Sequence, residues 1–316
     1  MRKLLAAALL LLIGPNLWAG EKDSSQVSPS KETLQAMEQW ITRLDSTEAA
    51  MDYMAGTISL NDHMASLSIP KGYKFIGRDQ ARFILEELWE NLPDERVLGM
   101  IVPENFQVNQ LNGEWAFVVS YDNIGFVKDK DADDINYEQL LQQLKTDEAA
   151  TNMERERLGY NTMNIMGWAA APYYDREKKI LHWAKEFRIQ GNTLNTLNYE
   201  VKILGRKGLI SLNAVGTMEQ FPAIREQLPH IIGMVQFNEG HRYADFDSGV
   251  DVVGAWNLGS LVVGKVMTND GILQWLLSSW KYIGLGMVIL AGIGWRQLKS
   301  RKDSALNPKE ILDMKA

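Results

Sequence analysis

The sequence predicts an α+β fold, in which a largely antiparallel sheet is packed with helices and followed by one C-terminal transmembrane helix. Strand-like runs cluster between Asn161 and Gly216 instead of alternating one for one with helical segments, a distribution that favours antiparallel pairing. Two of these runs flank the sequence GRKG, residues 205–208, which is typical of a hairpin turn. Residues 272–295 are apolar enough and long enough to cross a bilayer.

The N-terminal segment has the pattern of a secretory signal. Two basic residues precede the apolar run Leu4–Ile13, which is too short to span a membrane as a mature helix. We expect cleavage after Ala19, so that residues 1–19 form the signal peptide. An uncleaved anchor is the alternative, because Leu17 stands where a small residue is preferred.

Residues 20–55 combine a polar leader with an amphipathic helix. The leader is rich in serine and charged residues and is expected to be flexible. Apolar residues then recur at helical spacing, which predicts a helix over residues 31–50; they are Leu34, Met37, Trp40, Ile41 and Leu44.

Residues 56–265 are expected to form the main domain. Runs rich in β-branched residues predict strands, and apolar residues three or four apart predict helices. In order, we expect strands at GTISL and ASLSIP, a helix over 78–91, strands at VLGMIVP and EWAFVVSYDNIGFV, a helix to about Arg157, four strands over 161–216, a helix over 218–232, a strand at GMVQF and a final helix within 245–264. Pro229 should break the helix that contains it, and Asp247 or Ser248 should open the last one.

Three alternating aspartates, Asp129, Asp131 and Asp133, pose the question of a calcium loop. An EF-hand loop needs glycine at its sixth position and a glutamate ligand at its twelfth, but these positions hold Asp134 and Leu140. We therefore interpret the segment as a helix start, capped by Asp133 or Asp134. No metal and no cofactor are expected.

The second apolar segment, residues 272–295, is expected to be a transmembrane helix that leaves residues 296–316 as a cytoplasmic tail. Basic residues follow it directly and favour the cytoplasmic side; they are Arg296, Lys299, Arg301 and Lys302. Lys281 within the segment is expected to snorkel outward, with a buried functional charge as the alternative. This topology predicts a single-pass protein of the cytoplasmic (inner) membrane whose main domain is extracytoplasmic.

The charge and the lack of cysteine argue against nucleic-acid binding and exclude chemistry that depends on a thiol. The net charge is −7, and because basic residues gather at the two ends of the chain, residues 20–280 are more acidic still. An acidic domain is a poor candidate for binding nucleic acid. The chain has no cysteine, which excludes disulfides, thiol catalysis and thiolate metal sites.

Several long strings resemble those of a bacterial family of predicted membrane-anchored proteins that carry a domain of unknown function, family 2167. The strings are GFVKDKDADDINYEQLL, GWAAAPYYD with LHWAKE, NTLNYEVKILGRKGLISLNAV and GHRYADFDSGVD. The resemblance covers roughly Gly56 to Lys265 and implies membrane anchoring, but it implies no activity. A weaker likeness, at the level of element order alone, is to PsbP-like sandwiches.

The segment KILHWAKEFRI alternates as a strand does, which puts His182 and Glu186 on one face. With Asp175 as a further carboxylate, this face is the candidate acid–base site; a solvated strand face is the simpler alternative. His182 and Glu186 would lie about 13 Å apart at 3.3 Å per residue, so we expect the missing partner to be Asn198 or Glu200 on the next strand.

Ligand-binding candidates are the residues of an aromatic cleft or its neighbours, namely Trp168, Tyr173, Trp183, Asn198 and Arg206. The aromatic residues equally fit a core, and Arg206 equally fits a solvated hairpin tip. Asp245, Asp247 and Asp251 are weak metal candidates, for which helix capping is the favoured interpretation.

Together these patterns predict a membrane-anchored extracytoplasmic protein, a binding or assembly module for an unidentified protein partner or small ligand. The bilayer is contacted through the C-terminal helix. The alternative is an extracytoplasmic enzyme with a His/carboxylate acid–base site. No G-x-S-x-G, H-E-x-x-H or dinucleotide fingerprint occurs in the sequence, so the enzyme is the less favoured hypothesis.

Overall fold

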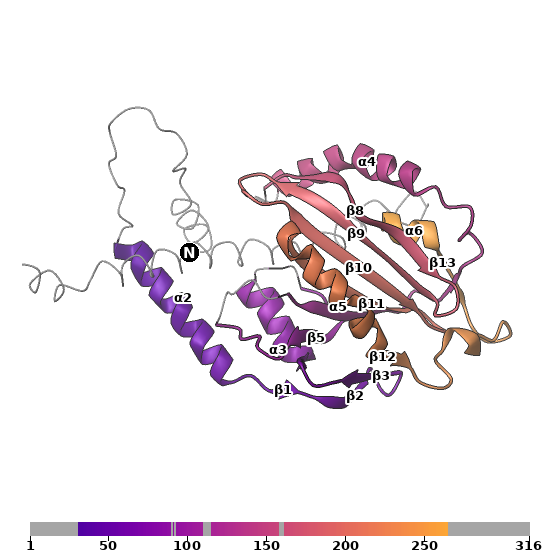
Figure 1. The fold of residues 1–316 in the computed structure, drawn as a ribbon, viewed down its shortest axis with the longest axis horizontal. Helices are drawn as coiled ribbons and strands as arrows, with labels where there is room; N and C mark the ends of the chain where they lie inside the picture. Colours follow the sequence, from indigo (N-terminus) through magenta and orange to yellow (C-terminus); the bar gives the residue numbers. More distant parts are fainter. Residues whose placement is uncertain (1–30, 90, 92, 110–114, 158–160, 265–316) are drawn as a thin grey trace, which may run out of the picture. The chain divides into compact units, whose positions relative to one another are not determined.

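The structure is a computed structural model that describes residues 31–89, 91, 93–109, 115–157 and 161–264 (Figure 1). The expected signal peptide, transmembrane segment and tail lie outside these residues. Among the described helices, none has both the length and the apolar character needed to cross a bilayer. The described residues fall into two compact units, 31–51 with 107–109 and 52–106 with the remainder to 264.

The first unit contains helix α2 (Lys31–Ala49), which confirms the helix predicted over 31–50. Its last turns hold the short segment 107–109 by side-chain hydrogen bonds. The backbone N–H of Val108 donates to Glu48, and the amide of Asn109 donates to Asp45 over 2.9 Å.

The second unit is organised around an eight-stranded sheet in which every neighbouring pair is antiparallel, as predicted. In spatial order its strands are β1 (Tyr53–Met54), β4 (Tyr73–Gly77), β5 (Val97–Pro103), β6 (Phe117–Asp122), β11 (Leu209–Thr217), β10 (Thr196–Leu204), β9 (Ile180–Ile189) and β8 (Met163–Asp175). The GRKG hairpin between β10 and β11 is confirmed, with Leu204 paired to Leu209.

The other described strands form two small sheets. One has the order β12 (Val235–Phe237), β3 (Ala65–Ile69) and β2 (Gly56–Leu60), and the other pairs β13 (Val253–Asn257) in parallel with β7 (Phe126–Lys128). The remaining helical segments are α3 (Arg78–Arg82), its π-helical continuation η1 (Phe83–Leu88), α4 (Tyr137–Arg157), η2 (Met218–Gln220), α5 (Phe221–Gly233), η3 (Tyr243–Asp245) and α6 (Leu258–Val263).

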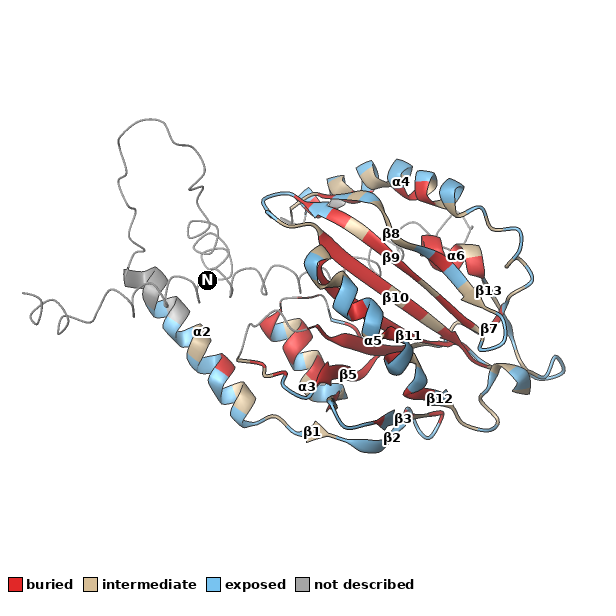
Figure 2. Ribbon diagram, viewed as in Figure 1, coloured by how far each residue is buried: buried red, intermediate tan, exposed pale blue. Residues whose placement is uncertain are grey.

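Helices pack on both faces of the main sheet, which gives each face its own core. Leu197, Tyr199 and Val201 of β10 share a buried cluster with Ile224 and Leu228 of α5, and we call this the α5 face. On the other side, residues of β9 and β10 pack against α6 and α4, and we call this the α6 face; the strand residues are Leu181, Trp183 and Leu204. Figure 2 shows β9, β10 and β11 buried along most of their length.

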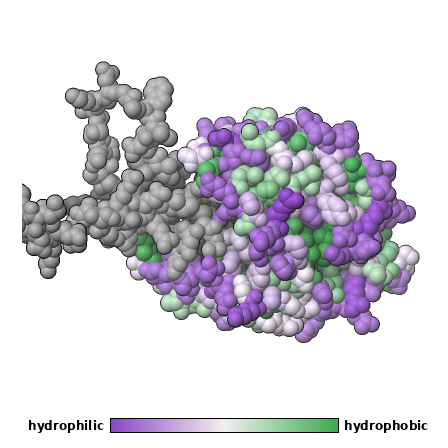
Figure 3. Space-filling view, in the orientation of Figure 1, coloured by the Kyte–Doolittle hydropathy of each residue, from purple (hydrophilic) through white to green (hydrophobic). Residues whose placement is uncertain are grey.

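The surface in the same view is mainly hydrophilic, with hydrophobic side chains grouped near the middle of the described part (Figure 3). Because both faces of the sheet are covered, the alternating polar residues of its strands do not all reach water. This property decides where the candidate sites lie.

The aspartate segment differs from its predicted role. Helix α4 begins at Tyr137, and its cap is Asn136, whose side chain accepts the N–H of Gln139 over 2.9 Å. The caps predicted at Asp133 or Asp134 are therefore wrong. Asp131 instead accepts the N–H groups of residues 258 and 259 at the start of α6, over 3.3 and 3.0 Å.

Two further expectations are corrected. Pro229 lies inside α5 and does not break it, because the apolar stripe of that helix stays packed on the sheet and outweighs one missing hydrogen bond. The final helix predicted within 245–264 is instead η3, strand β13 and the short α6. Asn257, and not Asp247 or Ser248, caps α6 by accepting the N–H of Ser260 over 2.9 Å.

Candidate functional site

His182 lies on the α5 face of β9, half-buried between two tyrosines. Its Nδ1 is 3.0 Å from the hydroxyl of Tyr199 on β10, and its ring lies 5.5 Å from the ring of Tyr173 on β8. Ala184 and Ile180, its neighbours on the same face, are buried in the core. The expected solvated strand face is therefore wrong at this position, because α5 and the core cover most of it.

Burial sets the electrostatics of this pair. Burial lowers the pKa of His182 below its ordinary value, although the charge of Asp175 acts in the opposite direction. Burial also raises the pKa of Tyr199 to about 12. Both groups are thus neutral at pH 7, and they are joined by one hydrogen bond.

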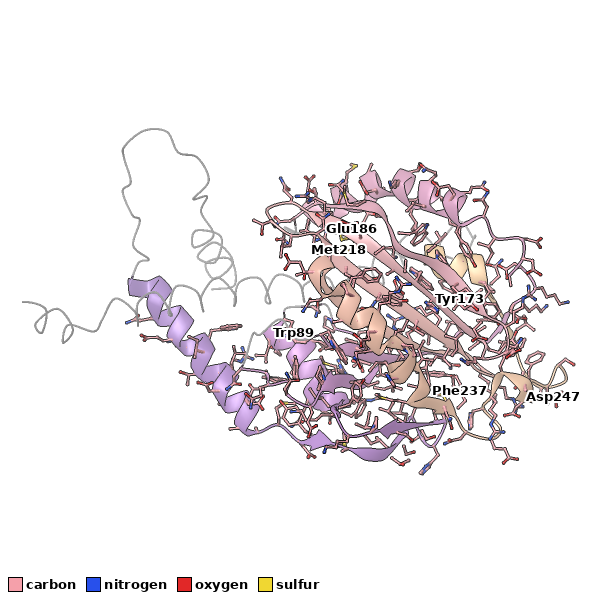
Figure 4. All side chains as sticks on the ribbon, viewed as in Figure 1. Trp89, Tyr173, Glu186, Met218, Phe237 and Asp247 are labelled. Atoms are coloured by element: carbon pink, nitrogen blue, oxygen red, sulfur yellow. The ribbon has the colours of Figure 1, made fainter. Side chains whose placement is uncertain are left out.

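The carboxylates predicted to assist His182 have other partners. Glu186 accepts a hydrogen bond from Asn195, and Asp175 accepts the backbone N–H groups of residues 177 and 178 over 3.0 Å each. Tyr173 and Glu186 belong to neighbouring strands at different points along the sheet (Figure 4). Among the described residues, neither carboxylate forms a hydrogen bond or an ion pair with His182.

The expectation that Asn198 or Glu200 completes this face is wrong. His182 pairs with Val201 across the β9–β10 ladder, so the odd-numbered residues of β10 share its face. Asn198 and Glu200 therefore point to the α6 face. The residue that reaches His182 is Tyr199.

The predicted aromatic cleft is divided between the two faces. Trp168 and Trp183 belong to the α6 face, where they pack with the cluster around α6. Tyr173 is 59% exposed and lies on the α5 face beside His182. Trp168 pairs with Lys185 of β9 and Tyr173 pairs with His182, and these two β9 residues point to opposite faces of the sheet.

Arg206 forms an ion pair with Asp251, one of the three weak metal candidates. Its Nε donates to Oδ2 of Asp251 over 2.7 Å, and its Nη1 donates to the carbonyl of Gly240 over 3.1 Å. Asp247 accepts the N–H of Gly249, whereas Asp245 accepts that of Arg242. Asp247 lies outside the main sheet, in the loop that follows η3 (Figure 4). The described residues hold no group of three or more carboxylates and histidines able to bind a metal.

The least expected feature is a set of charged and polar side chains on the α6 face around β10. Glu200 stands at its centre, directly opposite Trp183 of β9 and Asn213 of β11. One pair away, Lys185 stands opposite Asn198, and on the other side Lys202 stands opposite Ser211. We call Trp183, Lys185, Asn198, Glu200, Lys202 and Asn213 the β10 polar cluster.

Glu200 forms ion pairs with both lysines of the cluster. Lys202 Nζ lies 3.1 Å from Oε2 of Glu200 and donates to Ser211 over 3.0 Å. Lys185 Nζ lies 3.5 Å from Oε1 of the same glutamate. The side chain of Lys185 is 5% exposed, which is rare for a lysine.

The chain of contacts continues towards β5. Ser211 donates to Asp122 over 2.7 Å, and Asp122 pairs with Arg96. Arg96 also pairs with Asp94 over 2.8 Å. Six charges thus alternate in sign across the sheet, with a positive group at the β9 end and a negative group at the β5 end.

Burial alone would raise the pKa of Glu200, but Lys202 and Lys185 outweigh burial and hold this pKa below its ordinary value. Glu200 is therefore ionised at pH 7. A buried carboxylate held by two lysines is a strong local field that can orient a polar ligand.

Three buried polar atoms of the cluster have no hydrogen-bond partner among the described residues. They are Nε1 of Trp183, Oδ1 of Asn198 and Oδ1 of Asn213. Their residues are 0%, 2% and 7% exposed. Each such atom costs roughly 1–3 kcal/mol when nothing pairs with it, and three of them surround one glutamate. Buried polar groups in this state are expected where water or a ligand binds.

The sequence contains one signal for this cluster. The strand NYEVKIL alternates polar and apolar residues, which normally indicates a solvated face. In the structure this face is covered instead, and the side chains of Lys202 and Glu200 are each only 15% exposed. Of its members, Trp183 and Asn198 were predicted as binding candidates, whereas Lys185, Lys202 and Asn213 were not.

A model of the family described as protein of unknown function (DUF2167) matches residues 52–294, and no curated protein matches the chain. Among solved structures, the chain is similar to cyanobacterial PsbP (CyanoP) from Synechocystis sp. PCC 6803, with 7% identity over 58% of this chain and 94% of that chain, at a TM-score of 0.33. It is also similar to the Ran-binding protein Mog1p from Saccharomyces cerevisiae, with 8% identity over 59% and 96%, at a TM-score of 0.31.

Proposed function

The chain belongs to the family of proteins of unknown function DUF2167, so its role has to be argued from its own residues, and we propose that it is a membrane-tethered extracytoplasmic binding module. Its binding site is the β10 polar cluster. The carrying observation is that three unpartnered, buried polar atoms surround an ion-paired glutamate. Such groups favour a bound molecule because a partner removes the cost of leaving them unpaired.

Binding also gives a role to the buried charges of Lys185, Glu200 and Lys202. A buried ion pair is weak support for stability, since apolar residues of similar size commonly stabilise a core as well or better. The cluster lies on the interior strands β9, β10 and β11 of the sheet. Rigid strands hold binding groups with better precision than loops do.

The location is proposed from the sequence alone. The charged start and apolar run of residues 1–19 support export, and the apolar length of residues 272–295 supports a membrane span. The basic residues after that span support a cytoplasmic tail, residues 296–316. The main domain would then meet periplasmic or extracellular ligands, and the PsbP-like sandwich remains an expectation about its fold.

The binding function is tested on the full chain, purified from membranes in a mild detergent. Molecules released by denaturation are identified by mass spectrometry and compared between the wild type, Lys185→Met and Lys71→Met. Lys71 is exposed and lies in the turn between β3 and β4, so it is a matched control for the loss of one lysine. We expect a molecule that is bound by the wild type and by Lys71→Met but depleted in Lys185→Met. Equal content in all three proteins contradicts the proposal.

One observation favours the enzyme as a second candidate. His182 is neutral at pH 7 through burial, as a general base must be, and Tyr173 beside it is exposed. If this site is catalytic, His182→Ala abolishes function in the cell while Lys185→Met leaves it. The binding proposal expects the opposite result.

A further inference from the structure

Lys185 has an unusually poor set of partners for a buried ammonium group. Its Nζ lies 3.5 Å from Glu200, a loose ion pair, and 5.9 Å from the ring centre of Phe187. An ammonium group carries three N–H donors. By comparison, Lys202 makes closer contacts, to Glu200 and to Ser211. Lys185 is therefore the group best placed to bind a further acceptor.

The indole N–H of Trp183 is a second donor at the same place. Trp183 precedes Lys185 by two residues on β9, so both side chains point to the α6 face. The indole nitrogen has no partner among the described residues. Two donors on one strand, one of them charged, match the two oxygens of a carboxylate.

Acceptors stand on the next two strands. Asn198 is the cross-strand partner of Lys185, and Asn213 lies across Glu200 from Trp183. The Oδ1 atoms of both asparagines are buried and unpartnered among the described residues. A ligand that satisfies them must itself carry N–H or O–H donors.

The distribution of charge supports the same ligand class. Lys185 and Lys202 share one carboxylate, that of Glu200. This leaves one positive charge in excess at the β9 end of the row of six charges. The compensating negative surplus lies at the other end, where Asp94 and Asp122 share Arg96. A carboxylate group placed beside Lys185 offsets this positive charge locally, whereas a cation at the same place would add to it.

We propose that the β10 polar cluster binds a small carboxylate that carries a hydroxyl or ammonium group beside its carboxyl group. The carboxylate accepts from Lys185 and Trp183. A neighbouring ammonium group can donate to both asparagine oxygens, whereas a neighbouring hydroxyl, which has one hydrogen, donates to one of them. This inference rests on the proposed binding function and names its ligand class. Free 2-hydroxy acids and amino acids share this chemistry, and the test separates them.

The test measures the melting temperature of the full chain in detergent with lactate, glycolate, glycine, glycolamide and sulfate in turn. A ligand at ten times its Kd raises Tm by about 3–6 °C for a domain of this size. We expect this rise with the 2-hydroxy acids lactate and glycolate, with the amino acid glycine, or with both kinds of compound. We expect none with glycolamide, which lacks the charge, or with sulfate, which lacks the donor. A rise with sulfate equal to that with the carboxylates overturns the inference.

Two variants locate the response. Lys185→Met should weaken carboxylate binding about tenfold or more, because a charge-assisted hydrogen bond is lost, whereas Lys71→Met should bind as the wild type does. Asn198→Leu removes an amide whose oxygen has no partner among the described residues and puts an apolar side chain of similar size in its place, so the variant should fold normally and still lose affinity. Unchanged affinity in a folded Asn198→Leu protein overturns the assignment.

Failure of this inference can be distinguished from failure of the proposed function. If no carboxylate raises Tm while membrane-purified protein still releases a molecule that depends on Lys185, the ligand class is wrong and the binding function stands. If neither result is obtained, both proposals are overturned.

Discussion

The Nζ atom of Lys179 lies 2.8 Å from Oδ2 of Asp129, a residue 50 positions earlier in the chain. The same carboxylate accepts the hydroxyl of Tyr174 over 2.8 Å and that of Tyr243 over 3.1 Å. Lys179 has a positive φ of 58°, a conformation that costs energy for a residue other than glycine. Asp129 thus ties together the turn before β9, the end of β8 and η3.

We predict that Asp129→Ala lowers the free energy of unfolding by about 3 kcal/mol, because it leaves Lys179 and the hydroxyl of Tyr174 without their acceptor. Urea denaturation measures the change. The matched control is Asp133→Ala, since Asp133 is 83% exposed and pairs with the half-exposed Arg176; the loss in this variant should stay within about 0.5 kcal/mol. Equal losses in the two variants would mean that the Asp129 contacts contribute nothing special.

Calcium should leave the melting temperature of the purified protein within error. The three alternating aspartates do not converge on one point, because each has its own partner. Asp129 holds Lys179, Asp131 holds the start of α6, and Asp133 pairs with Arg176. A ligand that binds only the folded state must raise Tm, so a rise with calcium that disappears in Asp131→Asn would show that a site forms there after all.

Sequence patterns predicted most of the local structure, but they could not predict what packs against each face of a strand. Alternation in KILHWAKEFRI correctly predicted β9, because that pattern is local. It could not predict that His182 faces Tyr199, since this depends on the register with β10. It also could not predict that only 15% of the Glu200 side chain is exposed. The final helix was mispredicted for the same reason: Val253 pairs with Phe126, a residue far away in sequence.

Stability should depend on His182 in a specific pH range. Its pKa is lowered by burial in the folded protein, so below the ordinary value of about 6.5 the unfolded chain binds a proton that the folded chain does not. The free energy of unfolding therefore falls as the pH drops below about 6.5. His182→Gln should lack this part of the dependence, which urea unfolding of both proteins between pH 8 and pH 5 measures. Parallel curves would show that His182 titrates alike in both states.

His182→Ala should cost about 1–2 kcal/mol, since the hydroxyl of the buried Tyr199 loses its partner. The sequence alone, through its expectation of a solvated face, predicted a smaller loss. Arg188→Ala on the same strand is the control, because Arg188 is exposed and should change stability by less than about 0.5 kcal/mol.

The proposed topology has a direct test in the cell. A reporter that is active only in the cytoplasm should work when it is fused after Lys302 and should fail when it is fused after Gly191. The first position lies in the proposed tail, and the second lies in the turn that follows β9. Activity after Gly191 and none after Lys302 would reverse the topology and end the argument for an extracytoplasmic site.

The last prediction separates function from stability at the β10 polar cluster. Glu200→Met leaves Lys185 and Lys202 buried without their shared counter-charge, so it should lower the free energy of unfolding by about 3–5 kcal/mol. Replacing all three residues by methionine removes every uncompensated charge, and the protein should return to within about 1 kcal/mol of the wild type. Both variants should lose the carboxylate response.

Acid adds an independent signature to this comparison. Because the lysines hold the pKa of Glu200 below its ordinary value, the ion pairs contribute stability above pH 4–5 that is lost as the pH falls through the lowered pKa. The triple methionine variant should lack that acid-dependent loss, which urea unfolding between pH 6 and pH 3 measures. If it unfolds as easily as Glu200→Met at neutral pH, the charges are a structural requirement of the sheet. The burial of two lysines and a glutamate in the β10 polar cluster would then no longer support a binding site.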